Sequence, residues 1–253
     1  MVLQRLIEEG LLLVQGDPHH DLRFGFRCRL LSSFDEIDGA RNPRSGQIKR
    51  VKLEILAVEK VLPLWESCFP EDRSPHRALD LAKTSPAPAV RRPVRSSPDW
   101  HAISYWDACR RGNYDEAIRA IQRALADGII GEQEAAELDK YFVARRECGK
   151  LWSYCNDNLM EDHQDKINTI MVGVAASKVL VETLEETHPG CAAANDATTD
   201  DDIDPEERDA SHYASLAYAR GGILESGSDD QKRLEYWTWW LTSAVSDATT
   251  DWS

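Results

Sequence analysis

The stretch LAVEKVLPLWESCFPEDRSPHRALDLAK, residues 56–83, decides the fold, because it predicts two helices and the turn between them. In and just before it, apolar residues recur at alternating four- and three-residue steps, which places them on one helix face. They are Val51, Ile55, Val58, Leu62 and Trp65. Phe69-Pro70 ends this helix, since a proline ring blocks the helical conformation of its predecessor, and Ser74-Pro75 begins the next one. The sequence therefore predicts a helical hairpin with one buried face.

The order VLPLWE, PEDR, P and RAL within residues 61–79 also resembles the signature hairpin of immunity protein family 5 of bacterial polymorphic toxin systems. DASHYASLAYARGG, residues 209–222, and DDQKRLEYWTWWLTSAV, residues 229–245, are similar to the closing helices of that family. The residues that carry the resemblance are packing and capping types: Leu62, Pro63, Trp65, Glu66, Pro70, Asp72, Arg73, Pro75, Ala78, Trp237 and Trp240. The charged residues of the turn can also pair locally, which is a common and weak arrangement.

This resemblance implies an immunity protein, which binds a cognate bacterial toxin in the cytoplasm of the producing cell and blocks it by occlusion. It implies no enzymatic activity, no catalytic residue and no cofactor. Two parts of the chain depart from the family pattern as we know it. The first fifty residues have no recognised counterpart, and residues 84–98 are richer in proline than we expect.

Length and composition limit the class of protein. A chain of 253 residues with 42% apolar content can form a proper core, as one large domain or two small ones. Residues 1–16 combine a short apolar run with early charges, unlike a signal peptide, and no window reaches the length of a membrane span, so we expect a cytoplasmic protein. The six cysteines form no CxxC pair and have no histidines at zinc spacing. We expect neither disulfides nor a structural metal.

The acidic residues are concentrated at one end of the chain. Residues 1–150 carry a formal net charge of +1 and residues 151–253 one of −15. Nucleic acid as a direct partner needs a basic surface, so this distribution favours a basic protein partner or simple solubility. Our hypothesis for a toxin-facing surface is the acidic set Asp200, Asp201, Asp202, Asp204, Glu206, Glu207, Asp229 and Asp230. If the toxin is a nuclease, its basic substrate groove would complement this surface.

The first fifty residues predict one clear helix and two ambiguous segments. Residues 1–16 have apolar positions at helical steps. Residues 22–30 alternate apolar and polar side chains, which fits a short strand or irregular segment and fits a helix equally well. Residues 39–50 are basic and rich in turn formers.

A proline-rich connector at residues 84–98 is the expected joint of the chain, between a hairpin subdomain, residues 1–83, and a helical one, residues 99–253. Residues 99–111 predict a helix, and Asn113 begins another that ends at Gly128. The stretch GNYDEAIRAIQRAL resembles the second helix of a tetratricopeptide repeat. We find no second copy, and a repeat array needs several.

The last hundred residues predict further helices separated by one acidic loop. Residues 132–149 and 167–184 are helical, and the second is apolar around most of its circumference, which predicts a central position. Residues 195–207 are too acidic to pack and predict an exposed loop, which lasts until Asp204-Pro205 caps the next helix.

Few residues indicate chemistry. Asp209 and His212 would share a helix face, and Glu161, Asp162, His163 and Asp165 lie together, but helical metal enzymes repeat such pairs on several helices. We therefore interpret His212 as a core or capping residue beside Tyr213 and Tyr218. Trp237 and Trp240 share a helix face that we expect to be buried, whereas Tyr236 and Trp239 point elsewhere and could serve an interface.

The prediction is thus an all-α, mostly antiparallel assembly of about eight helices, residues 1–253, forming one domain. The first functional hypothesis is toxin neutralisation. The alternative is a helical adaptor or regulator that holds a peptide or protein through the tetratricopeptide-like hairpin. A third is a metal-dependent helical enzyme, which stoichiometric metal in the purified protein would support.

Overall fold

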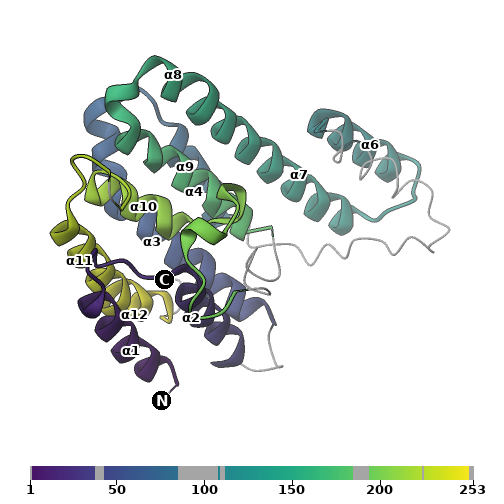
Figure 1. Cartoon of the computed structure of the whole chain (residues 1–253). Helices are drawn as coiled ribbons and strands as arrows, with labels where there is room; N and C mark the ends of the chain where they lie inside the picture. The colour runs from purple at the N-terminus through teal and green to yellow at the C-terminus, as the bar shows by residue number, and fades with distance from the viewer. Residues whose placement is uncertain are drawn as a thin grey trace.

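The computed structural model describes residues 2–37, 43–84, 108, 112–184, 194–223 and 225–250, and every regular element in these ranges is helical (Figure 1). The α-helices are α1 (Val2–Gly16), α2 (Phe24–Ile37), α3 (Pro43–Cys68), α4 (Ser74–Thr84), α6 (Tyr114–Ala126), α7 (Glu132–Ser153), α8 (Met160–Asp162), α9 (Ile167–Glu182), α10 (Ala210–Ala219), α11 (Asp230–Trp239) and α12 (Val245–Ala248). Single π-helical segments, Tyr154–Leu159 and Trp240–Ala244, join α7 to α8 and α11 to α12. The all-α prediction is confirmed.

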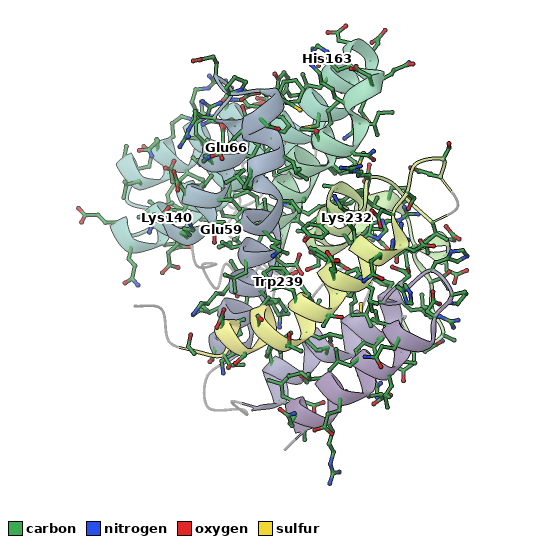
Figure 2. The ribbon with its side chains drawn as sticks, turned by 90° about the vertical axis from the view of Figure 1, so that its left-hand side faces the viewer. Glu59, Glu66, Lys140, His163, Lys232 and Trp239 are labelled. Carbon is green, nitrogen blue, oxygen red and sulfur yellow. The ribbon has the colours of Figure 1, made fainter. Side chains whose placement is uncertain are left out.

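Helix α9 forms the centre of the structure, as its apolar circumference predicts. Eleven of its sixteen residues are buried, and α3, α4, α7 and α10 pack around it. Gly173 permits close contacts with two neighbours of α9, because a Cβ there would lie 2.9 Å from the Trp65 ring and 2.5 Å from the Cys155 sulfur. The closing helices α11 and α12 lie between α1 and α3 (Figure 2).

The α3–α4 hairpin has the predicted form. Val51, Ile55, Val58 and Trp65 are buried on one face of α3, and Leu62 is partly buried. The Trp65 indole nitrogen donates a 2.8 Å hydrogen bond to the carbonyl of Asp72, so the ring lies under the turn and closes it. This hairpin packs directly on α9 and shares its core with the C-terminal helices. The division into subdomains at residues 84–98 stays a prediction, because residues 85–98 lie outside the described ranges.

The two segments of the first fifty residues whose patterns were ambiguous are both largely helical. Residues 24–30 belong to helix α2, and the strand alternative is wrong: this helix is buried on most sides, so its apolar side chains do not reveal a helical period. Helix α3 already begins at Pro43, within the stretch that is basic and rich in turn formers. Gly46 of α3 permits the close approach of α2, since a Cβ at this position would lie 2.8 Å from the Cα of Asp35.

Helices α6 and α7 form a second hairpin with a hydrophobic cluster of its own. Asn113 caps α6 as predicted, accepting a 3.1 Å hydrogen bond from the backbone of Glu116, and Gly128 ends it with a φ of +70°. The cluster contains Ile121 and Phe142 among several alanines. The helix predicted for residues 99–111 falls outside the described residues, apart from Ala108. None of the helices in the described ranges is long and apolar enough to cross a membrane.

Candidate partner-binding surface

The acidic segment between α9 and α10 is ordered by its own polar side chains. Thr199 and Asp202 form a reciprocal capping box around the short turn Asp200–Asp202. Asp204 caps a second short turn, Pro205–Glu207, by accepting a hydrogen bond of 2.9 Å from the backbone of Glu206. Asp204-Pro205 thus caps the next helical segment as predicted, but this segment is only the short 3₁₀ helix Pro205–Glu207. Helix α10 begins after Asp209, which is its N-cap.

A buried arginine on α2 anchors both ends of this segment. The Arg27 guanidinium makes two hydrogen bonds to the carboxylate of Asp200, of 2.6 and 3.1 Å. Its Nε donates to Asp209 at 2.8 Å. Arg27 is fully buried and both carboxylates are nearly so. Because ion pairs in the interior are screened little and satisfy each other's hydrogen bonds, this cluster fixes the segment firmly on α2.

The first turn of α2 touches the acidic segment through its backbone. The amide of Gly25 donates a 3.1 Å hydrogen bond to the carbonyl of Thr198. A Cβ at Gly25 would lie 1.4 Å from the carbonyl oxygen of Asn195, so only glycine fits. The acidic segment is thus held by main-chain contact as well as by charge.

The burial of Asp200 corrects part of the predicted exposed loop. Asp200 lies in the interior, because its charge is needed by Arg27, and Arg27 and His212 hold the pKa of its carboxyl far below the usual range despite burial. Asp201, Asp202, Asp204, Glu206 and Glu207 are exposed. Of these, Asp202 and Asp204 also serve the caps described above. The acids left for a partner are chiefly Asp201, Glu206 and Glu207.

The second acidic pair of the hypothesis also has structural duties. Asp229 caps α11 by accepting a 3.0 Å hydrogen bond from the backbone of Lys232. Asp230 pairs with the buried Arg233 at 2.5 Å and lies 3.4 Å from a ring nitrogen of His19. The Asp230 side chain remains 43% exposed, so a partner can still reach it.

The connection between α1 and α2 brings the two acidic segments together. Arg233, beside Asp230, donates a 3.1 Å hydrogen bond to the carbonyl of His19. Two residues further on, burial raises the pKa of the Asp21 carboxyl, and the nearby charge of Asp200 raises it further. Sequence reasoning missed Arg27, because its partners Asp209 and Asp200 lie 182 and 173 residues away and no local pattern marks it.

The pair considered for metal binding has a structural role. One oxygen of Asp209 accepts the backbone N–H of His212 at 2.7 Å, and the other accepts from Arg27. The His212 ring is buried, with an edge contact to Tyr213 at 5.2 Å between centroids, in line with its interpretation as a core residue. Within the described ranges, no three His, Cys, Asp or Glu side chains are placed to hold a metal ion.

The aromatic residues of α11 support the anchor from the other side. Trp237 is buried, with its ring 5.3 Å from the Arg27 guanidinium carbon, and Trp240 donates to the Ser211 hydroxyl at 2.8 Å. Tyr236 is also fully buried, which corrects the prediction that it points away from the core. Trp239 is half-buried, on the side of α11 seen in Figure 2, and Lys60 covers its ring at 4.9 Å.

The hairpin motif lies at the other end of the molecule and is structural. Pro75 and Ala78 are buried in α4, and the Asp72 carboxylate accepts the backbone N–H of Ser74 at 2.8 Å. Glu66, far from α1 in Figure 2, pairs with His76 at 2.9 Å. Pro63, inside α3, is exposed, as are Pro70 and Arg73 in the turn. These positions shape the hairpin and bring no reactive groups together.

In a comparison with known protein families, the model described as immunity protein Imm5 matches residues 7–88 and 129–247. The match covers both motif stretches, the α1–α2 connection and the acidic segment. It extends through most of the first fifty residues, where we recognised no counterpart, and leaves out residues 89–128, which contain α6. No curated protein matches the chain.

Proposed function

Because the chain belongs to the Imm5 family of immunity proteins, we propose that it binds a cognate protein toxin in the cytoplasm of the producing cell and blocks that toxin by occlusion. The family match carries this proposal. Charged residues in the interior have structural roles: Arg27 pairs with Asp200 and Asp209, and Asp209 also caps α10. Such roles suit a protein that acts by binding.

We propose that the toxin-facing surface is the acidic face formed by Asp201, Glu206 and Glu207, with Asp230 beside the α1–α2 connection. A surface fixed before binding loses little conformational entropy when the partner docks, and the Arg27 cluster supplies that rigidity. Acidic groups on such a surface also steer a basic partner toward it. A nuclease with a basic substrate groove is the toxin class that fits best.

A pull-down with tagged protein from the native host, followed by growth rescue, tests this function. We expect a stoichiometric partner that is toxic when expressed alone in a naive cell, and normal growth when this chain is co-expressed. A partner that is not toxic would contradict immunity. It would favour the helical adaptor, with the α6–α7 hairpin as its peptide-binding element.

A further inference from the structure

Helix α1 lies at the edge of the molecule (Figure 1), and two of its leucines are exposed to solvent. Leu6 and Val14 on its inner face are buried, whereas Leu12 is 70% and Leu13 is 46% exposed. Three of the seven large hydrophobic residues that are exposed in the described ranges belong to this one helix. Leu12 and Leu13 are adjacent, whereas Val2 lies at the other end of the helix, and exposed apolar side chains that are contiguous are typical of interaction sites.

A groove of about 470 Å³ lies beside these leucines. It is formed by the end of α1, the α1–α2 connection and the start of the acidic segment. Four carboxylates line it, those of Glu9, Asp17, Asp21 and Asp196, against one guanidinium, that of Arg23. A volume of this order, within the range of about 300–1,000 Å³ for ligand sites, accepts several side chains of a protein segment.

The carboxylates of the groove differ in how far they are already satisfied. Arg29 is shared by Glu9 and Asp196, at 2.6 and 3.0 Å, and the Asp17 side chain accepts the backbone N–H of His19 at 2.9 Å. The Asp21 carboxylate has no hydrogen-bond donor among the residues that the structure describes. The groove therefore combines an apolar wall with a carboxylate that accepts no hydrogen bond, although Arg27, His212 and Arg233 lie near enough to favour its charged form.

We propose that this groove binds a protein segment in which a lysine or arginine stands next to an apolar side chain. The apolar side chain would pack on Leu12 and Leu13, and the cation would pair with Asp21. Resting on the proposed function, we assign this segment to the toxin, so that the groove extends the acidic face into an anchoring site. A second copy of this chain, with its formal charge of −14, is the less complementary occupant.

Synthetic peptides test the groove without any toxin. The probe is a short peptide of leucine and lysine, with a leucine and glutamate peptide as its counterpart. We expect the first to shift the methyl resonances of Leu12 and Leu13 and the second to leave them unchanged. Leu12→Arg, which places a competing cation in the groove, should weaken binding at least about tenfold, equivalent to about 1.4 kcal/mol.

Val2→Arg is the matched control, since Val2 is 56% exposed on the same helix and lies about 15 Å from Leu12 along it. Equal losses from the two variants, or peptide shifts elsewhere on the protein, would overturn the proposal. Both side chains are exposed, so both variants should fold, which thermal melting checks.

Binding and growth-rescue experiments with the toxin distinguish a failure of the groove assignment from a failure of the proposed function. If Leu12→Arg binds the toxin as tightly as the wild type while growth is still rescued, immunity stands and the groove assignment is wrong. If no toxic partner exists, immunity fails and the peptide result alone decides the groove. A concentration-dependent dimer that Leu12→Arg abolishes would assign the groove to a second copy and contradict our choice of occupant.

Discussion

The body of the molecule, α1–α4 with α9–α12, and the α6–α7 hairpin are held together by different kinds of contact. In the body, tryptophans and buried ion pairs join helices that are distant in sequence, as Arg27 joins α2 to Asp200 and Asp209. In the hairpin, alanines with Ile121 and Phe142 join helices that are sequence neighbours. The family match covers the body and leaves out α6. We infer that the family fold depends on the long-range contacts, and that α6 is an addition to it.

The largest effect should come from removing the charge at the centre of the body. Arg27→Leu leaves the carboxylates of Asp200 and Asp209 buried without their guanidinium partner, which should lower the free energy of unfolding by about 3–5 kcal/mol. Urea unfolding measures this change. Arg29→Leu is the control, because Arg29 is 38% exposed and its ion pairs should contribute no more than about 1 kcal/mol. Equal losses from the two variants would show that the buried cluster does not stabilise the body.

A smaller and local effect is expected in the hairpin. Ile121→Ala removes the main apolar contact of α6 with α7 and should cost about 2–3 kcal/mol. Hydrogen exchange should show faster exchange of the α6 amides and unchanged exchange in α9, because Ile121 belongs to the cluster between α6 and α7 and not to the core around α9. A matching rise in α9 would contradict the division into body and hairpin.

The smallest effect concerns two buried groups of the body, a thiol and a phenol, whose pKa values are raised by burial. Burial raises the pKa of the Cys155 thiol to about 12 and that of Tyr213 to about 12. Both are neutral in the folded state, whereas the unfolded thiol ionises near about 8.5 and the phenol near about 10. Their contribution is present below those values and lost as pH rises toward the folded pKa, so stability should fall between about pH 8.5 and about 12.

Cys155→Ala isolates the thiol in that experiment. It should flatten the part of the decline between about pH 8.5 and 10, as measured by urea unfolding at each pH. The same decline in the variant and the wild type would assign the effect to other groups.

Local patterns were enough to predict the helices whose apolar residues face one way. The α3–α4 hairpin, the cap at Asn113 and the central α9 were all predicted from spacing and turn chemistry. Patterns failed where a helix is buried on most sides, as in α2, and where a turn former serves a close approach, as Gly46 does beside Asp35. Burial on most sides removes the helical period from the sequence, and a close approach at a glycine has no sequence period at all.

The candidate surface could be predicted only in outline. The excess of acid pointed to the segment between α9 and α10, but it could not show that Asp200 is buried, since Arg27 lies 173 residues earlier. Nor could it show that the exposed Leu12 and Leu13 lie beside that segment, because this depends on how α1 and α2 pack. Long-range ion pairs and exposed apolar positions became visible only in the folded chain.

We propose that the exposed acids on this rigid surface bind the toxin. Stopped-flow association with the identified toxin tests this binding most directly. The variant Asp201→Asn, Glu206→Gln, Glu207→Gln keeps the Arg27 cluster and the caps. We expect its association rate to be lower by roughly tenfold or more at low salt, with a flatter salt dependence and unchanged stability. An association rate and salt dependence equal to those of the wild type would contradict the account.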